Sequence, residues 1–148
     1  MTYKYQSYLE NIPNCPPENY SAITKLAFRW LHETIDNDYN FQPVLLQSPK
    51  RALNMNHLNQ CKGYGLSFFD TANGAIDRYL ELITSKPNLI DTLGNNLGEI
   101  YLTPQDGVCS EPETNNNGHF TFHEYKNTDL ARKIIKFAQI NTFLQLEK

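Results

Sequence analysis

Residues 72–83 show the clearest pattern of hydrophobic and polar positions in the chain. Apolar side chains recur there every three or four positions, and polar side chains fill the opposite face. This spacing predicts an amphipathic helix that ends before Pro87. Either Asp70 or Thr71 can cap its first turn. We expect the apolar face of this helix to pack on a sheet, and that face comprises Ala75, Ile76, Tyr79, Leu80 and Ile83.

Strands are predicted where β-branched, aromatic and other apolar residues form short runs. Three such runs are 64–69, 98–103 and 119–125. A fourth run, 41–46, contains Pro43, which suits a strand at the edge of a sheet because proline donates no backbone hydrogen bond. Together these runs predict a sheet of several strands.

Residues 21–33 fit two structures. Their apolar positions recur at helical spacing, and Ser21 can cap the first turn, which predicts a helix over 21–33. Every second side chain from Leu26 to Trp30 is also large and apolar. That alternation fits a half-buried strand over 26–31, so both structures stay open.

The other segments are predicted from their polar runs and from residues that break regular structure. Residues 50–63 lack a sustained apolar period and indicate a loop with room for one helical turn. Residues 89–93 form one or two helical turns that Gly94 ends. Residues 110–118 indicate a mobile polar loop. Apolar positions over 128–138 predict a last helix.

This order of elements predicts an α+β fold, with a mixed or antiparallel sheet and about three flanking helices. Residues 21–148 are expected to form one such domain. Residues 1–20 hold four tyrosines and three prolines, which predicts an irregular arm that packs by its aromatic rings. The segment 104–107 reads as a tight turn that gives Gly107 a positive φ.

Composition limits the class of protein. The chain has 148 residues, of which 40% are hydrophobic, and this is enough apolar content for one domain with a buried core. No apolar run approaches the roughly 20 residues of a membrane span, and no secretory signal is visible, so we expect a cytoplasmic protein. A net charge of -3 argues against non-specific binding to nucleic acid or anionic lipid.

The cysteines Cys15, Cys61 and Cys109 are odd in number and lie more than forty residues apart. No Cys-x-x-Cys pair is present to start a zinc site. We therefore predict three free thiols and no bound metal. Cys61 is the candidate for a reactive thiol, because Lys62 beside it would lower the pKa of the thiol.

Residues 119–125 contain the densest polar cluster. On a strand, His119 and His123 share one face but stand about 13 Å apart, which is too far for both to bind one metal. Residues 119–122, His-Phe-Thr-Phe, resemble the His-x-Thr-x motif of the 2H phosphoesterases. That family carries two such motifs, whereas the segment around His57 lacks the threonine.

A second resemblance spans about two thirds of the chain. Residues 26–30, residues 65–79 and the strand that carries Glu124 resemble the layout of ADP-ribosyltransferase-type domains. In that superfamily an Arg or His on a first strand holds NAD, a strand with Ser or Tyr precedes a helix, and a late Glu performs catalysis. The resemblance implies a small, toxin-like enzyme of bacterial conflict systems, with NAD as a substrate rather than a tightly bound cofactor.

The chemistry of NAD suits these residue types. Cleavage of the nicotinamide–ribose bond creates a cation of oxocarbenium character, which a carboxylate stabilises. A guanidinium binds the pyrophosphate with two parallel hydrogen bonds, and aromatic rings stack on the nicotinamide. The candidate catalytic residues are Glu124, Ser67 and His119, and the candidate ligand-binding residues are Arg29, Tyr64, Gly65 and Phe69.

The sequence leaves other functions open. Nine tyrosines and mild acidity are typical of a surface that binds another protein, so the alternative is a non-catalytic module of immunity or antitoxin type. A phosphoesterase is the third hypothesis. The expected partner is therefore a small nucleotide or a protein. The one basic stretch, Lys50 and Arg51 with Lys62 further along, could meet a phosphate or an acidic partner surface.

Overall fold

Strands and helices alternate along the chain in the computed structural model, which describes residues 2–142. The predicted domain extends to 148, and residues 143–148 lie outside the described part. The strands are β1 (Lys25–Leu31), β2 (Leu66–Phe69), β3 (Asn96–Leu102), β4 (Gly107–Cys109), β5 (His119–Glu124) and β6 (Ile134–Gln139). The α-helices are α1 (Gln6–Leu9), α2 (Val44–Gln47), α3 (His57–Gly63), α4 (Ala72–Ser85) and α5 (Leu89–Leu93). The 3₁₀ helices are η1 (Asp38–Phe41), η2 (Pro49–Asn54), η3 (Thr114–Asn116) and η4 (Leu130–Lys133).

The strands of the described residues form a six-stranded sheet in the order β4-β5-β2-β1-β3-β6, with every neighbouring pair antiparallel. β1 pairs with β3 along its whole length, and β2 pairs likewise with β5. By contrast, β1 and β2 meet at a single pair, Phe28 and Phe69. The sheet therefore consists of two halves, β4-β5-β2 and β1-β3-β6, that are joined at one position. This arrangement confirms the predicted α+β class.

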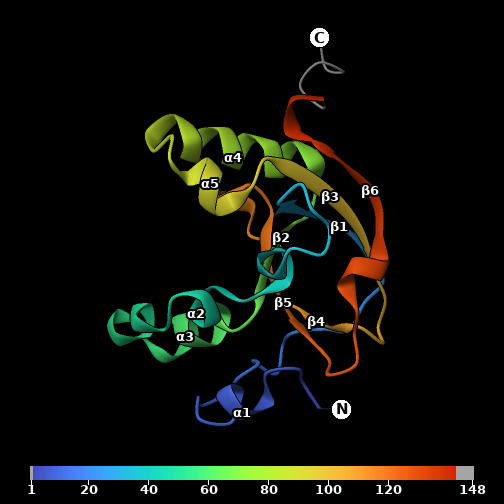
Figure 1. Cartoon of the computed structure of the whole chain (residues 1–148). Coiled ribbons are helices and arrows are strands. Elements are labelled where there is room, and N and C mark those ends of the chain that lie inside the picture. Colours follow the sequence, from blue (N-terminus) through green and yellow to red (C-terminus); the bar gives the residue numbers. More distant parts are fainter. Residues whose placement is uncertain (1, 143–148) are drawn as a thin grey trace.

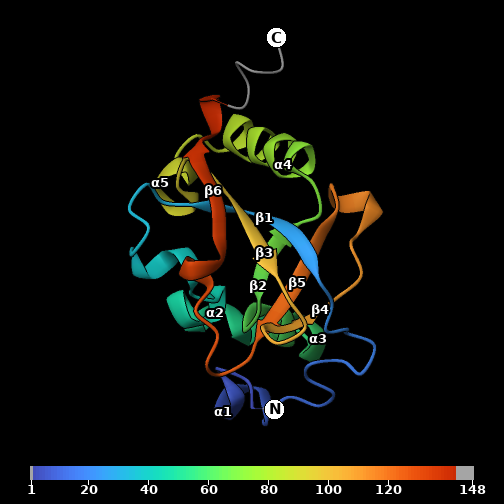
Figure 2. The same ribbon diagram turned by 90° about the vertical axis from the view of Figure 1, so that its right-hand side faces the viewer.

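Helix α4 covers one face of the sheet at the end where α5 also lies, and α1 lies at the opposite end of the molecule (Figures 1 and 2). The side chains of Ala75, Ile76 and Tyr79 are buried against Phe69 and Leu97, while Leu80 and Ile83 are partly buried against the same cluster. Thr71 caps the helix by accepting a hydrogen bond from the Gly74 backbone. The predicted amphipathic helix is thus confirmed.

The other face of the sheet carries a second core. Its buried residues come from five of the strands and from η4, and they are Ala27, Leu66, Phe68, Ile100, Leu102, Cys109, Phe120, Phe122 and Leu130. Because both faces are covered near the centre of the sheet, β5 is buried on both sides after its first residue. The face of Phe120 and Phe122 packs in this core, while the polar face is buried as well at Thr121 and His123.

The strands predicted over 64–69, 98–103 and 119–125 are confirmed as β2, β3 and β5. Residues 26–31 form the strand of the two alternatives, and the helix over 21–33 is wrong. The reason is packing on both faces, since Phe28 and Trp30 pack beneath α4 while Ala27 belongs to the opposite core.

Three other predicted elements differ from the structure. Residues 41–46, predicted as a strand, contain the end of η1 and most of α2, because Pro43 begins a helical turn rather than protecting a sheet edge. Residues 128–138, predicted as a helix, form η4 and β6. Pairing with the free edge of β3 overrides the helical spacing there. The loop 50–63 instead contains η2 and α3.

Gly107 does not have the predicted positive φ; among the described glycines that conformation occurs at Gly94 and Gly118. Gly107 is required for another reason, since a Cβ there would collide with the backbone oxygen of His123 on the neighbouring strand.

The first residues of the chain fold back onto the same region. Lys4 donates its backbone N–H to the carbonyl of Glu124, and Tyr3 pairs with Tyr125.

Cys15 and Cys61 form a disulfide, so the prediction of three free thiols is wrong. Cys109 is the free cysteine of the described residues, and it is buried. The separation of 46 residues along the chain did not indicate the pairing, because the arm folds back across the end of α3.

No helix among residues 2–142 has both the length and the apolar character that a bilayer crossing requires.

Candidate functional site

A cleft opens where β1 and β2 separate beyond their single shared pair. Its volume is about 360 Å³, and we call it the β1–β2 cleft. Arg29 and Trp30 of β1 line one side, and Gly65, Ser67 and Phe69 line the other. Residues from η1, α2 and α5 complete its walls. Four of the seven predicted site residues therefore lie together: Arg29, Gly65, Ser67 and Phe69.

The lining of the β1–β2 cleft is positively charged. Arg29, Arg51 and Lys62 all line it, and no Asp or Glu does. The whole chain carries a net charge of -3, so the cleft has the opposite sign to the molecule that contains it. Cations that line a concave, partly desolvated surface attract anionic ligands.

The Arg29 side chain is partly buried, and its guanidinium forms no ion pair in the described part of the chain. Its Nε donates to the Asn40 carbonyl at 2.7 Å, and its Nη1 donates to the Ser67 carbonyl at 2.8 Å. Burial lowers the pKa of Arg29 to about 10, and the charge of Glu124 opposes that shift. Arg29 is therefore protonated at neutral pH. Because a guanidinium has five N–H donors, this cation keeps donors for a ligand.

Ser67, His119 and Glu113 form a chain of hydrogen bonds, which we call the proton relay; Ser67 lines the cleft, whereas His119 and Glu113 lie outside its lining. The Nε2 atom of His119 lies 2.9 Å from the Ser67 hydroxyl, and its Nδ1 atom lies 3.1 Å from a Glu113 carboxylate oxygen. Ser67 is exposed, whereas the side chain of His119 is 19% exposed. A hydroxyl, an imidazole and a carboxylate in this order are the groups of a Ser-His-acid triad.

The pKa values in the proton relay favour a neutral imidazole. Burial lowers the pKa of His119 below its ordinary value, although Glu113 acts in the opposite direction. Burial alone would raise the pKa of Glu113, but hydrogen bonds from Asn116 and His119 lower it below its ordinary range. The ionised Glu113 then accepts from the His119 Nδ1–H, so that Nε2 is free to accept the Ser67 proton.

The backbone explains how these groups meet. Ser67 and Thr121 are paired on β2 and β5, and His119 lies two residues from Thr121 on the same face of β5. Glu113 reaches His119 because the segment between them turns back, with positive φ at Asn117 and Gly118. The Glu113 N–H also donates to the His119 carbonyl at 2.8 Å.

Glu124 does not line the β1–β2 cleft. Its carboxylate is 2% exposed and forms an ion pair with Lys4 at 2.9 Å, on the face of β5 that carries Phe120 and Phe122. Burial raises the pKa of Glu124, while the hydrogen bond from Lys4 opposes this shift. Tyr64 also lies outside the lining, because its ring stacks on Tyr8 with 4.9 Å between centroids.

Gly65 lies in the cleft wall because two strands approach closely there. A Cβ at this position would lie 2.7 Å from Thr121 Cγ2 and 3.0 Å from the Phe122 carbonyl oxygen. Phe69 packs at a tilt against Trp30 with 5.0 Å between ring centroids and lies edge-on to His119 at 5.7 Å. The glycine thus brings β2 close to β5, and the aromatic rings support the histidine.

Sequence reasoning missed Glu113 as a member of the site, whereas Arg51 and Lys62 had been named only as basic residues that could meet a phosphate, and both line the cleft. A signal for Glu113 was present, since the run Asn115-Asn116-Asn117-Gly118 is typical of a tight reversal. Such a reversal before the strand at His119 places residue 113 beside residue 119. No comparable local signal existed for Lys62, which reaches the cleft through the path of α3.

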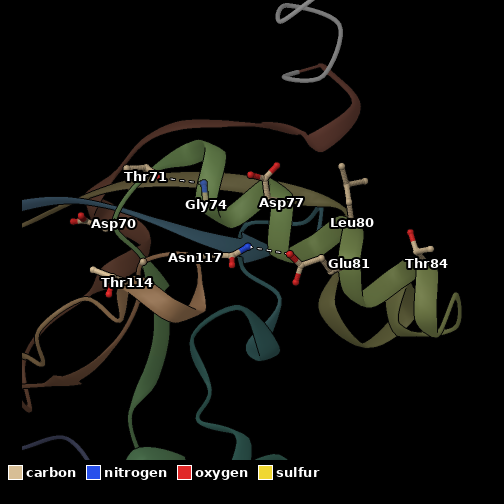
Figure 3. A pocket seen from close by; sticks show the side chains of 10 residues that line it. Asp70, Thr71, Gly74, Asp77, Leu80, Glu81, Thr84, Thr114 and Asn117 are labelled. Atoms are coloured by element: carbon tan, nitrogen blue, oxygen red, sulfur yellow. Dashed lines mark hydrogen bonds between the residues drawn. The ribbon is translucent and has the colours of Figure 1, made fainter.

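A larger hollow of about 900 Å³ lies along α4 (Figure 3). Its lining includes the carboxylates of Asp70, Asp77 and Glu81, and it contains no Lys or Arg. The side chains of Asn117 and Glu81 point toward each other across it (Figure 3). Its charge is opposite to that of the β1–β2 cleft, and none of the predicted site residues lines it.

Comparison with known proteins gives no match to a family model, to a curated protein or to a solved structure. The class of chemistry therefore has to be inferred from the residues themselves: the β1–β2 cleft supplies a partly buried guanidinium, other cations, aromatic rings and Ser67, and Ser67 is hydrogen-bonded to His119 outside the lining.

Proposed function

We propose that the β1–β2 cleft binds a phosphate-bearing nucleotide of NAD type, and that the protein is an ADP-ribosyl-type enzyme. It would hydrolyse NAD or transfer its ADP-ribosyl group, as a toxin-like domain of a bacterial conflict system. One observation carries the proposal: the Arg29 guanidinium forms no ion pair within residues 2–142, and the charged residues that line its cleft, Arg29, Arg51 and Lys62, are all cations, of which Lys62 pairs with Glu113. An anion is the ligand that such a site lacks.

The proposed binding uses the chemistry of each wall. The free N–H groups of Arg29 hydrogen-bond the pyrophosphate, and Lys62 and Arg51 add positive charge at the rim. The partly buried Trp30 ring, which packs on the buried Phe69, offers apolar surface for a nicotinamide or adenine ring. These contacts fix the nucleotide with its ribose near Ser67.

The proposed reaction uses the proton relay. A water molecule attacks C1′ of the nicotinamide riboside, the C1′–N bond breaks, and nicotinamide leaves with the electron pair of that bond. The water proton passes to the Ser67 oxygen as the Ser67 proton passes to His119 Nε2. Glu113 stabilises the imidazolium that results. An acceptor hydroxyl in place of water gives ADP-ribosyl transfer.

Calorimetric titration with NAD and ADP-ribose tests the binding step. We expect Arg29→Ala to weaken ADP-ribose binding by about 1 to 3 kcal/mol, or about 5- to 150-fold in Kd. The affinity of Arg29→Lys for ADP-ribose should lie between those of the unchanged protein and Arg29→Ala, because lysine keeps the charge but lacks the planar pair of N–H donors. The matched control is Arg132→Ala, because the Arg132 side chain is 86% exposed and does not line the cleft. Absence of heat with millimolar NAD and ADP-ribose would contradict the proposal.

Release of nicotinamide, measured by chromatography, tests the chemical step. His119→Ala and Ser67→Ala should lower the turnover by about 10²- to 10⁴-fold while ADP-ribose still binds, because general-base groups act mainly in the transition state. His57→Ala is the control, since His57 is exposed on α3. Equal turnover in His119→Ala and the unchanged protein would remove the relay from the mechanism.

A second function, binding of a protein partner, is favoured by one observation. Leu26 and Tyr101 are direct neighbours on β1 and β3, and they are 45% and 44% exposed. Paired exposed apolar side chains on a sheet are typical of a contact surface. The phosphoesterase hypothesis lacks comparable support, because it needs a second histidine whereas His119 bonds to Ser67 and Glu113.

A further inference from the structure

Three potential metal ligands meet on the far side of β5 from the second core. The Sγ atoms of Cys15 and Cys61 and a ring nitrogen of His123 all lie within 4.8 Å of one another. They come from the arm, from α3 and from β5, which are distant in sequence. Cys61 and His123 are buried, and Cys15 is partly buried. In the oxidised chain the two cysteines of this cluster form a disulfide.

The distances fit a tetrahedral metal site. Zinc binds sulfur at about 2.3 Å and imidazole nitrogen at about 2.0 to 2.1 Å, so tetrahedral ligand atoms stand about 3.5 to 3.8 Å apart. The Cys61 Sγ and the His123 Nε2 are 3.8 Å apart. The Cα atoms of Cys15 and Cys61 are 5.6 Å apart, so rotation of the side chains can separate the two sulfurs after reduction.

His123 supplies an independent observation. The residue is 2% exposed, its Nδ1 has no hydrogen-bond partner among the described residues, and its Nε2 has only the contact to sulfur. An imidazole whose nitrogens have no other hydrogen-bond partner can bind a metal. The rings of Tyr3 and Tyr20 lie against His123 and hold it in place.

We propose that Cys15, Cys61 and His123 bind one Zn²⁺ ion once the disulfide is reduced, with water as the fourth ligand. A dithiol or phosphine reductant supplies two electrons, and the two sulfurs take up two protons to become thiols. Zinc then displaces both thiol protons and bonds to two thiolates and the imidazole nitrogen. Thiolate and imidazole ligands favour zinc over calcium or magnesium. This inference replaces the expectation of no metal, and it does not depend on the proposed nucleotide chemistry.

The disulfide and the zinc ion are then alternative cross-links between the same three segments. Either one holds the arm against α3 and β5, where Lys4 also pairs with Glu124 beside His123. The arm is therefore fastened in both redox states. In the oxidised chain the disulfide holds it, and in the reduced chain the zinc ion holds it.

The test uses the full chain, reduced with a phosphine under anaerobic conditions and then freed of reductant. We expect elemental analysis after zinc loading to give one zinc per chain, and cobalt(II) to give the strong visible bands of a tetrahedral thiolate site. The oxidised chain should bind neither ion. Substoichiometric zinc and absent cobalt bands in the reduced chain would overturn the proposal, as would equal zinc binding by the oxidised chain.

Variants assign the ligands. Cys61→Ser and His123→Gln should each weaken zinc binding by about 10- to 100-fold or more, whereas Cys109→Ser should bind as the unchanged chain does. Cys109 is the matched control because it is a buried free thiol outside the cluster. Circular dichroism shows which variants fold, and the cobalt spectrum of the unchanged chain decides the proposal if a variant does not. Retention of full zinc affinity in a folded Cys61→Ser or His123→Gln variant would contradict it.

Discussion

The charge of Arg29 survives in a partly buried place because two backbone carbonyls hold it there. Carbonyl oxygens stabilise the guanidinium without neutralising its charge. Arg29 therefore keeps a positive charge that can bind an anionic ligand. His119 differs, because it exchanges hydrogen bonds with a neutral hydroxyl and an ionised carboxylate. Arg29 therefore carries a fixed charge beside Phe41 and Phe68, whereas His119, which packs against Phe69, can change its proton.

The pKa of His119 should respond to Glu113. Because the negative charge of Glu113 raises the pKa of His119 against the effect of burial, Glu113→Gln should lower that pKa further. The imidazole then stays neutral to a lower pH. Titration of the His119 ring protons by NMR measures the shift, with the exposed His57 as the internal reference. An upward shift in Glu113→Gln would contradict the assignment of the Nδ1 hydrogen bond.

His123 should make the folded state less stable in acid. Its pKa is about 4 in the folded protein, below the ordinary value of 6.5, so the unfolded chain binds the proton more tightly. Below pH 6.5 the free energy of unfolding should therefore decrease as the pH falls toward 4. Urea unfolding at several pH values measures this slope. His123→Gln should flatten it, and His57→Ala should leave it unchanged.

At the scale of elements, the sequence predicted the helices and strands whose own residues show a clear pattern, and it missed the strand that forms only by pairing with a neighbour. Helix α4 and strands β2, β3 and β5 carry their own periodicity and were predicted correctly. β6 was predicted as a helix because its apolar positions fit that spacing, whereas its structure depends on the free edge of β3. No local signal reports such an edge.

The same distinction explains the candidate site. Arg29 and Ser67 were predicted from their places in the ADP-ribosyltransferase resemblance, and both line one cleft in the structure. Glu124 was predicted from its place on the last strand of the resemblance, but the alternation along β5 turns it to the opposite face from Ser67 and His119. Glu113 was missed because its role depends on a chain reversal.

Substitutions in α4 should separate the buried face from the exposed face. Ile76 is 2% exposed beneath the helix, so Ile76→Ala should lower the free energy of unfolding by about 2 to 4 kcal/mol through lost burial and a cavity. Asp77 is its exposed neighbour, and Asp77→Ala should change that energy by less than about 0.5 kcal/mol. Chemical denaturation followed by circular dichroism measures both. Equal effects would mean that α4 does not pack on the sheet by this face.

At the scale of the whole molecule, the arm is fastened to the domain at three kinds of contact. The Cys15–Cys61 disulfide, the Lys4–Glu124 ion pair and the Tyr3–Tyr125 bridge all join it to α3 or to the end of β5. The cleft lies between the two halves of the sheet, and its β2 wall directly follows α3. Attachment of the arm therefore supports the half of the sheet that carries the proton relay.

Loss of the disulfide should lower the stability of the metal-free chain. A cross-link across 46 residues restricts the unfolded chain, and its removal typically costs about 2 to 4 kcal/mol. Cys15→Ser, assayed without metal, should lower the thermal midpoint by several degrees, while Cys109→Ser measures the effect of losing a thiol that makes no cross-link. An unchanged midpoint in Cys15→Ser would show that the disulfide contributes nothing to the stability of the domain.

The single pair at Phe28 and Phe69 gives the molecule a mechanical property. The two halves of the sheet, β4-β5-β2 and β1-β3-β6, meet at one point of backbone pairing. Side chains therefore hold most of the angle between them, and that angle changes more easily than the angle between fully paired strands. A molecule that fills the β1–β2 cleft sets this angle, and the angle in turn sets how tightly that molecule is held. Substitutions far from the cleft that twist one half of the sheet against the other will thus change affinity without touching the ligand.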